Sequence, residues 1–418
     1  MQIERNCNID LDSIPIDSYW NDGDEKECKM HRIHAYPAKF PAFITTKAIH
    51  YATKRNINIE LVADIFCGCG TVCYETAKYG KNFWGCDINP VATLIANTKN
   101  HKYQTEKLDY YYELILKEFK NNEEADIEVS ERIKYWFKEK QINDLYTLKK
   151  TIVNVLDNEE YYLNFFLCAF SNILKPTSRW LTKSIKPQID QNKKIADVLE
   201  AFKIQFLIMR RANLQNQISE SSKIEIENIN FLEKKTTSSF VDLIITSPPY
   251  VTSYEYADLH QLSSLWLGYT DDYKKLRTGT IGSLYHSTDF DSNFKHLNSV
   301  GKKIVSELEK IDKSKAKAVA KYFVDMQNVA IKSYHILKSK GLIFFVIGNT
   351  EYKAVRINNA QHLIESMFSA GFINIEVFRR KISKKILTPY RDQNGRFTTD
   401  KNSRKVYSEE FIIIGEKI

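Results

Sequence analysis

Long apolar runs are missing from this sequence of 418 residues. The longest apolar stretches, such as residues 161–170 and 341–348, are too short to span a bilayer. No basic segment followed by an apolar segment opens the printed sequence, so it shows no sign of a secretion signal. We therefore expect a soluble, cytoplasmic protein that has no membrane partner.

Cysteine is scarce, and its spacing does not suit disulfides or zinc. The seven cysteines are an odd number, and four of them lie between residues 67 and 86, within an expected strand-loop-helix core. This arrangement argues against a secreted disulfide framework. Cys28-x-x-His31-x-x-His34 could supply metal ligands, but no pair of Cys-x-x-Cys knuckles occurs, so we expect no metal.

The composition is that of a folded protein with a modest excess of positive charge. Hydrophobic residues make up 43% and aromatic residues 12%, which excludes a generally disordered chain. The 60 Lys and Arg residues against 52 Asp and Glu residues give 60 − 52 = +8. This excess favours a polyanionic partner, although many soluble enzymes carry a similar charge.

A glycine loop follows the first predicted strand. Residues 61–66 form a short apolar strand, and Gly68 and Gly70 come directly before a predicted helix over 71–79. The next predicted strand, 82–87, ends in Asp87 and leads into a helix. This order is typical of the nucleotide-binding half of a doubly wound sheet, in which the acid accepts hydrogen bonds from ribose hydroxyls.

A second strand ends abruptly at two prolines. Residues 240–245 are apolar and β-branched, as in a buried parallel strand, and Thr246-Ser247-Pro248-Pro249-Tyr250 follows. Neither proline can donate a backbone hydrogen bond, so the sheet pairing must stop there. The segment therefore lies at the carboxyl end of a strand, where open α/β sheets place their ligands.

The rest of the chain adds helices and then returns to the sheet. Apolar residues at helical spacing predict helices over 110–121, 131–140, 159–175 and 195–216. Later strands are predicted over 223–228, 341–347, 373–378 and 410–414. Residues 379–405 carry ten Lys or Arg and two acids, which predicts a basic flap. We predict an α/β fold with a doubly wound, mostly parallel sheet and a helical insertion.

The two strand-end motifs resemble those of one family. DIFCGCGT, residues 64–71, resembles motif I of class I S-adenosylmethionine-dependent methyltransferases, and TSPPY, residues 246–250, resembles motif IV of amino-methylating DNA methyltransferases. The Ser form of motif IV is most familiar in cytosine-N4 enzymes. Residues 34–41 are similar to the family segment near the methionine end of the cofactor.

The order of these motifs is like the family's α arrangement, with the target-recognition region between the two halves. It implies an N-terminal segment and cofactor-binding half over 1–104, a helical insertion and candidate target-recognition region over 105–220, and a catalytic half over 221–418. It also implies a Rossmann-like fold and S-adenosylmethionine as the cofactor. No family motif matches the insertion.

The resemblance implies roles for individual residues. The motif after the third strand usually ends in an acid, whereas Asn230 or Asn228 stands here. Ser247, Pro248, Pro249 and Tyr250 would hold the target base. The expected cofactor contacts are Lys39, Phe40, Asp64, Phe66, Gly68, Gly70, Thr71, Asp87, Ile88 and Asn230. The expected nucleic-acid contacts are Arg179, Arg210, Arg211, Arg277, Arg391 and Arg396.

The implied reaction is methyl transfer to an exocyclic amino group of a base in DNA, with cytosine N4 preferred over adenine N6. The partner would be double-stranded DNA with the target base flipped out, with a cognate restriction endonuclease beside it in a restriction-modification or phage-defence system. Cytosine-C5 methylation is disfavoured, because none of the nine prolines precedes a cysteine nucleophile. RNA amino-methylation and a catalytically silent nucleic-acid-binding subunit remain as alternatives.

Overall fold

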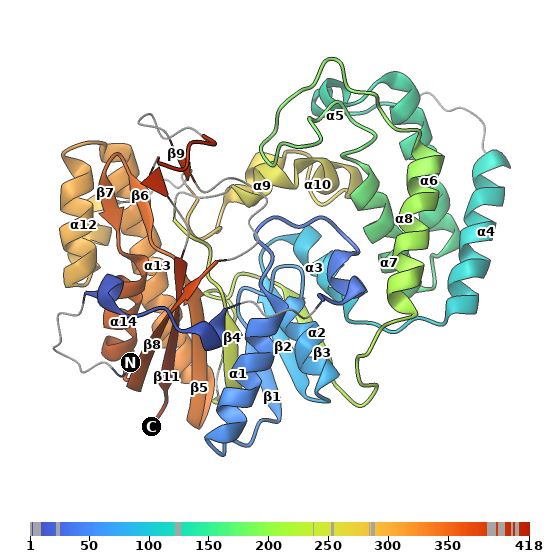
Figure 1. The fold of residues 1–418 in the computed structure, drawn as a ribbon. Coiled ribbons are helices and arrows are strands. Elements are labelled where there is room, and N and C mark those ends of the chain that lie inside the picture. Colours follow the sequence, from blue (N-terminus) through green and yellow to red (C-terminus); the bar gives the residue numbers. More distant parts are fainter. Residues whose placement is uncertain are drawn as a thin grey trace.

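A seven-stranded sheet forms the centre of the computed structural model (Figure 1). The described residues are 2, 10–21, 26–121, 127–236, 238–251, 255–283, 285, 289–382, 390–391, 398–402, 404–405 and 409–418. The strand order is β3-β2-β1-β4-β5-β11-β8. The bounds are β1 Leu61–Asp64, β2 Asn82–Asp87, β3 Ile224–Asn228, β4 Val241–Thr246, β5 Leu337–Ile347, β8 Ile373–Lys381 and β11 Glu409–Glu416.

Strand direction confirms the predicted fold class. The pairs among β3, β2, β1, β4 and β5 are parallel, and β11 is antiparallel to both β5 and β8. The chain progresses from β1 outward to β3 on one side and from β4 to β5 on the other. The strand order therefore reverses between β1 and β4, which is the switch point where doubly wound sheets bind ligands.

Alternate side chains of each strand pack against two different layers of helices, one on each face of the sheet. In β5, Leu342, Phe344 and Val346 join the core with α1 (Ala42–Lys54) and α2 (Thr71–Lys78). The intervening residues Ile343, Phe345 and Ile347 join the core on the opposite face. This alternation follows from the two-residue period of a strand, and both faces are apolar because both are covered.

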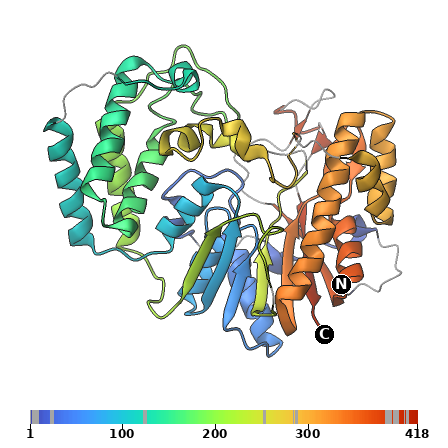
Figure 2. The ribbon, with the colours of Figure 1, turned by 180° about the vertical axis from the view of Figure 1, so that it is seen from behind.

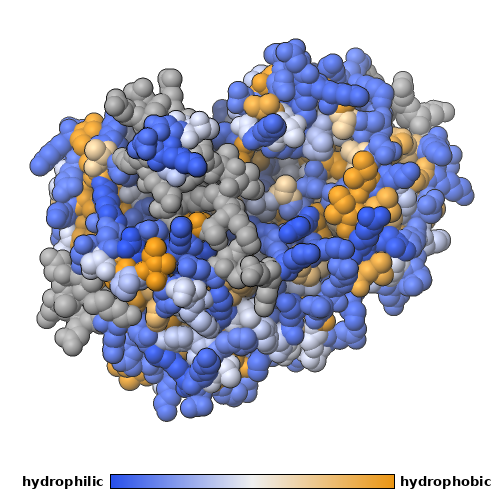
Figure 3. All heavy atoms as spheres, in the orientation of Figure 1, coloured by the Kyte–Doolittle hydropathy of each residue, from blue (hydrophilic) through white to orange (hydrophobic). Residues whose placement is uncertain are grey.

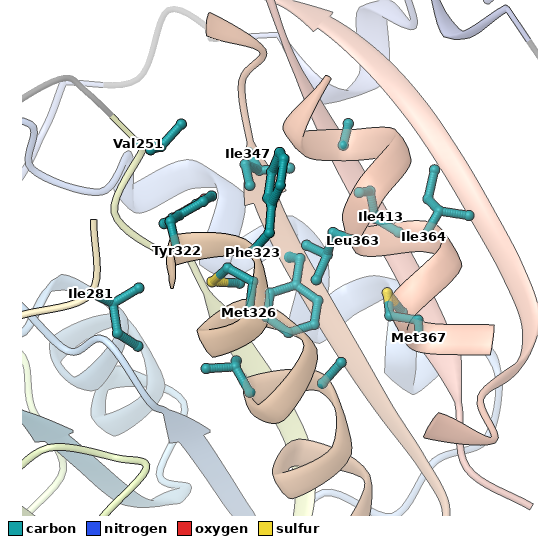
Figure 4. Close-up of a cluster of buried hydrophobic side chains, with 14 of the residues drawn as sticks. Val251, Ile281, Tyr322, Phe323, Met326, Ile347, Leu363, Ile364, Met367 and Ile413 are labelled. Carbon is teal, nitrogen blue, oxygen red and sulfur yellow. The ribbon is translucent and has the colours of Figure 1, made fainter. Parts of the chain in front are cut away.

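The opposite layer is formed by three helices of the C-terminal half. α12 (Ser299–Glu309), α13 (Lys313–Ile336) and α14 (Asn359–Ala370) contribute to one core cluster with the strands. Figure 4 shows Phe323 and Met326 of α13 beside Leu363 and Met367 of α14. α3 (Pro90–Lys99) follows β2 and packs against α7 (Glu160–Ile173).

Five helices between α3 and β3 form the predicted insertion, and they share one core cluster with residues of α2, α3 and α10 (Gln261–Leu267). They are α4 (Thr105–Asn121), α5 (Glu131–Trp136), α6 (Glu139–Val155), α7 (Glu160–Ile173) and α8 (Val198–Asn213). This helical unit lies beside the sheet (Figure 1). The sequence did not predict α6 as a separate helix. Its target-recognition role stays a prediction.

Short elements complete the described structure. They are η1 (Leu11–Ser13), η2 (Ser18–Trp20), η3 (Lys29–Arg32), α9 (Tyr256–Leu259), α10 (Gln261–Leu267), η4 (Tyr273–Arg277), α11 (Phe290–His296), β6 (Thr350–Tyr352), β7 (Val355–Ile357), β9 (Tyr390–Arg391) and β10 (Arg404–Lys405). The predicted basic flap begins later than expected, because residues 379–381 belong to β8. Much of the remaining flap lies outside the described residues.

The surface is mostly hydrophilic in the view of Figure 3, with an apolar patch over the helical unit. On α8 the side chains of Ile204, Leu207 and Ile208 are exposed. Among the described helices, none has the length and apolar character needed to cross a membrane.

Candidate active site

The two motifs predicted from the sequence meet at the switch point of the sheet. Asp64 is the last residue of β1, and Thr246 is the last residue of β4. The Thr246 hydroxyl donates a hydrogen bond to Asp64 Oδ1 at 2.6 Å, and the backbone N–H of Phe66 donates to the same oxygen at 3.1 Å. Asp64 is 2% exposed, and burial raises its pKa to about 7 despite these two bonds.

The glycine loop lies directly beyond β1. Gly68 and Gly70 both adopt positive φ angles, of 49° and 71°, which a side chain would disfavour. The loop leads into α2, whose first residue, Thr71, is buried. The backbone N–H of Gly68 donates to Asp87 Oδ2 at 2.8 Å, so the acid at the end of β2 fixes the position of the loop.

Asp87 combines the features expected of a ribose-binding carboxylate. Its two oxygens accept backbone N–H groups from Gly68 and Asn89, and burial raises its pKa. Two ionised carboxylate oxygens offer about four acceptor positions, so about two positions remain for further donors. The residue therefore fits the pair of hydroxyl groups that a ribose presents.

Residues that follow β2 and β3 converge on a glycine-containing loop. Asn230 donates from Nδ2 to the carbonyl of Gly279 at 3.2 Å, while its Oδ1 accepts the N–H of Leu232. A Cβ built at Gly279 would come within 3.1 Å of Ile88 Cδ1. Ile88 and Asn230, both predicted cofactor contacts, are thus brought together beside this loop.

The other predicted cofactor contacts have structural partners of their own. Lys39 forms an ion pair with Glu27 at 2.6 Å and donates to the carbonyl of His31 at 2.8 Å. Phe40 packs against the core on the α1 face of the sheet, and Phe66 against the core on the opposite face. Their cofactor roles stay predictions.

Ser247 is oriented by the neighbouring strand. Its hydroxyl donates to the carbonyl of Val346 in β5 at 2.8 Å. A hydroxyl has one proton, so this bond leaves the Ser247 oxygen with lone pairs only. Ser247 can therefore accept a hydrogen bond from a substrate donor. Pro248 is buried, and Pro249 is half-buried.

Tyr250 is tied to the sheet through a buried ion pair. Its hydroxyl donates to Glu410 Oε2 at 3.1 Å, and the other oxygen of Glu410 accepts from Arg380. Arg380 is 2% exposed and Glu410 is 7% exposed. The Tyr250 ring lies against Gly348, where an added Cβ would come within 3.0 Å of it. These contacts fix the ring against Gly348 at the end of β5.

The sequence did not single out an aromatic stack beside the glycine loop. The ring of Tyr36 stacks on His260 at 5.1 Å between centroids and on Tyr256 at 6.5 Å. A Cβ added to Gly68 would lie 3.5 Å from the Tyr36 ring. The available signal was the pair Tyr36-Pro37 in the segment that resembles a family motif, whereas α9 and α10 gave no signal for Tyr256 or His260.

A buried polar network joins His34 and α10 to the helical unit. His34 Nε2 pairs with Ser171 Oγ of α7 at 2.9 Å, and Ser171 donates to Ser263 of α10 at 2.8 Å. Burial lowers the pKa of His34 to about 4, which keeps its ring neutral near pH 7. In the part of the chain that the structure describes, no group of His, Cys, Asp and Glu side chains could hold a metal ion.

The arginines predicted to contact nucleic acid differ in their ion pairs and in their exposure. Arg210 forms a bidentate ion pair with Asp109, with bonds of 2.5 and 2.6 Å. Arg277 pairs with Asp258 in the same way, and its side chain is 13% exposed. Arg211 is exposed.

The remaining arginines differ in how much the structure describes. Arg179 donates to the carbonyls of Lys134 and Tyr135. Arg391 lies in β9, and Arg396 lies outside the described residues. Nucleic-acid contact stays a prediction for all six arginines.

Comparison with known proteins finds similarity to DNA methylases and type II methyltransferases. The DNA methylase family N6_N4_Mtase matches residues 6–98. The type II methyltransferase M.MvaI of Kocuria varians is 25% identical over 386 residues, which cover 85% of this chain and 84% of that protein. The type II methyltransferase M.MjaII of Methanocaldococcus jannaschii is 35% identical over 85 residues, 20% of this chain and 15% of that protein.

Solved structures are more distant. The rRNA methyltransferase aviRa from Streptomyces viridochromogenes is 8% identical, with a TM-score of 0.29, over 92% of this chain and 88% of that chain. TM-scores this low support neither fold nor substrate, so the fold class rests on the strand order. The sequence matches and the site agree with the predicted cofactor, S-adenosylmethionine. Together, the family match and the two relatives support an amino-methyltransferase of DNA.

Proposed function

We propose that this protein transfers a methyl group from S-adenosylmethionine to the exocyclic amino group of a flipped-out base in DNA, with cytosine N4 preferred. The observation that carries the proposal is the orientation of Ser247. Its proton is directed to Val346, so its oxygen can only accept from the substrate. The preference for cytosine rests on the resemblance of the Ser form of motif IV to cytosine-N4 enzymes, and adenine N6 is the alternative.

An exocyclic amino nitrogen is a poor nucleophile, because its lone pair is delocalised into the ring. Hydrogen bonds from the amino group to the Ser247 hydroxyl and the Pro248 carbonyl favour a pyramidal nitrogen with a localised lone pair. Tyr250 would stack on the base and hold it in place. The acceleration then comes from positioning and electrostatic stabilisation, without a covalent intermediate on the enzyme.

The cofactor would be held by the loop around Gly68 and Gly70 and by Asp87. When bound, S-adenosylmethionine supplies an electrophilic methyl group. The Asp87 carboxylate has unused acceptor positions for ribose hydroxyls, and the positive φ of both glycines lets the backbone approach a ligand. We expect Ile88 and Asn230, which both lie against Gly279, to contact the adenine ring.

Both relatives carry the name type II methyltransferase, and we therefore place the reaction in restriction-modification. A cognate endonuclease acting on the same DNA sequence would be the functional partner. The chain would act on double-stranded DNA, because the base must leave the helix to reach Ser247.

Mass spectrometry of nucleosides tests the reaction directly. DNA from cells that produce the protein, and DNA treated with purified protein and S-adenosylmethionine, would be digested and analysed. We expect N4-methylcytosine, whereas N6-methyladenine would support the alternative base. Methylation of RNA alone, or of neither nucleic acid, would refute the proposed function.

A paired substitution tests the site. Ser247→Ala should lower methylation by at least about 100-fold, the size expected for loss of a transition-state hydrogen bond, while cofactor affinity stays nearly constant. Ser369→Ala is the matched control, because Ser369 of α14 also donates to a backbone carbonyl, at 3.0 Å, but lies outside the site. Equal activity of the two variants would contradict the role of Ser247.

A further inference from the structure

The connection between α7 and α8 is the most basic segment of the helical unit that the structure fully describes. Residues 174–197 contain six Lys or Arg and two acids, so their formal charge is 6 − 2 = +4, half of the +8 of the whole chain. The six cations are Lys175, Arg179, Lys183, Lys186, Lys193 and Lys194. Within the described parts of the chain, none of the six forms an ion pair with a carboxylate.

Backbone carbonyls hold the three inner cations. Lys193 donates to the carbonyls of Lys175 and Trp180, each at 2.7 Å. Lys175 donates to the carbonyl of Ser184 at 2.8 Å, and Arg179 donates to two carbonyls at the end of α5. A carbonyl oxygen carries only a partial charge, so these bonds order the segment without neutralising its cations.

The positive charge of the inner cations is crowded. Burial and, to a lesser extent, the neighbouring charge of Lys175 lower the pKa of Lys193 to about 8, while Asp190 opposes the shift. Burial also lowers the pKa of Lys175. A bound anion would relieve this repulsion. Lys183, Lys186 and Lys194 occupy exposed positions of the same segment.

Aromatic packing fixes the segment to the catalytic side of the molecule. Trp180 stacks on Trp136 of α5 at 5.0 Å between ring centroids, and the N–H of Arg179 donates to the carbonyl of Trp136 at 2.8 Å. Trp136 in turn donates from Nε1 to Gln261 of α10 at 3.0 Å. α10 follows the end of β4, so the segment lies on the side where the parallel strands end (Figure 2).

We propose that residues 174–197 form a phosphate-binding surface for the backbone of duplex DNA on either side of the target base. This inference rests on the proposed function and deepens it, because it assigns DNA contact to a particular segment of the helical unit. Lys183, Lys186 and Lys194 contact phosphates, while Arg179, Lys175 and Lys193 order the segment. Such contacts add affinity without base specificity.

The test compares two triple variants of the full chain. Lys183→Gln, Lys186→Gln and Lys194→Gln together remove the exposed charges of the segment. Lys54→Gln, Lys223→Gln and Lys340→Gln form the control. These exposed lysines lie before β1, before β3 and near the start of β5, at the opposite edge of the sheet. Both variants change the net charge by the same amount.

Binding to a 30-base-pair duplex would be followed by fluorescence anisotropy from 50 to 200 mM salt. We expect the segment variant to bind about 10- to 100-fold more weakly, with a log-log salt slope smaller by about 2–3, while the control stays within about threefold of the wild type. Equal affinity and equal salt slope for the two variants would overturn the proposal.

Methylation separates this inference from the proposed function. Wild-type protein that methylates DNA, together with a segment variant that binds DNA normally, would refute the phosphate-binding surface alone. Wild-type protein that neither binds nor methylates duplex DNA would refute both. Binding of S-adenosylmethionine by the segment variant, measured by calorimetry, should equal that of the wild type, which shows that the variant is folded.

Discussion

Thr246 donates a hydrogen bond to Asp64 across the switch point of the sheet, at 2.6 Å. The two residues are 182 positions apart in the sequence and end the adjacent strands β4 and β1. Both are at most 2% exposed. The bond therefore joins the segment that leads to the cofactor loop with the segment that leads to Ser247.

Removing the Thr246 hydroxyl should weaken this junction. Thr246→Val keeps the shape of the side chain but deprives the buried Asp64 carboxyl of a donor, so the free energy of unfolding should fall by about 1–3 kcal/mol. Thr246→Ser retains a hydroxyl, so its free energy of unfolding should fall by a smaller amount. Urea unfolding followed by circular dichroism measures both, and equal stability of Thr246→Val and the wild type would contradict the prediction.

Asp64 should make stability depend on pH in an unusual direction. Burial raises its pKa in the folded state to about 7, above the ordinary value of 3.8, so the folded state holds the proton more tightly than the unfolded state. The stabilising contribution is complete below pH 4 and is lost as the pH rises to about 7. Asp64→Asn removes this effect and should therefore gain stability relative to the wild type between pH 4 and 7.

The difference between the two proteins isolates this effect, because buried histidines titrate in both. The pKa values of His31 and His34 are lowered to about 4, so their contribution to stability rises with pH over the same range. Urea unfolding at several pH values provides the comparison. A stability difference that does not change with pH would show that Asp64 titrates normally.

The glycines of the cofactor loop should differ in their tolerance of alanine. A Cβ at Gly70 would come within 2.9 Å of Ala96 Cα and 2.7 Å of Asn100 Nδ2, whereas a Cβ at Gly68 would meet Tyr36 no closer than 3.5 Å. Gly70→Ala should therefore destabilise the fold by about 1–3 kcal/mol and weaken cofactor binding. Gly68→Ala should be milder, since only its backbone angle is strained. Thermal unfolding with and without S-adenosylmethionine measures both effects.

Local sequence signals predicted the elements that place the site. The strand predicted over 82–87 is confirmed as β2, Asn82–Asp87. Its bounds could be predicted because a turn precedes the apolar residues and an acid ends them. α6 was missed although Ile142, Leu145, Leu148 and Ile152 repeat at helical spacing, because the preceding predicted helix was continued too far, to residue 140. The sequence therefore showed the apolar spacing of α6 but did not show where the preceding helix ends.

Long-range pairing could not be predicted from the sequence. Arg210 forms a bidentate ion pair with Asp109, 101 residues away, and no local pattern indicates this partner. Likewise, the partner of Tyr250 depends on the register between β8 and β11, which places Arg380 opposite Glu410. No local pattern encodes such a register. The basic flap was therefore predicted to include Arg379 and Arg380, which lie in β8.

Removing one partner of the buried ion pair between Arg380 and Glu410 should destabilise the fold more than removing both partners. Arg380→Leu leaves the Glu410 carboxylate buried without its cation, which should lower the free energy of unfolding by about 3–5 kcal/mol. The double variant Arg380→Leu with Glu410→Leu should be less destabilised than the sum of the single variants. Lys140 and Asp144, an exposed pair on α6, serve as the control and should show little coupling. A double-mutant cycle in urea measures the coupling.

Tyr250 should act mainly through its ring, with its hydroxyl fixing the position of that ring. Tyr250→Phe keeps the aromatic surface but loses the hydrogen bond to Glu410, so kcat/KM should fall by about tenfold or less. Tyr250→Ala removes the stacking surface, worth about 1–3 kcal/mol per base, and should raise KM for DNA as well as lower kcat.

Steady-state methylation with a duplex substrate, and calorimetry with S-adenosylmethionine, separate the two roles. Cofactor affinity should be the same in both variants, because Tyr250 lies on the β4 side of the switch point. If Tyr250→Phe lost as much activity as Tyr250→Ala, the hydroxyl and its contact with Glu410 would be the essential feature, and the stacking role would be wrong. A substrate with an unpaired target base should rescue Tyr250→Ala only in part, because flipping costs less there but the ring is still missing.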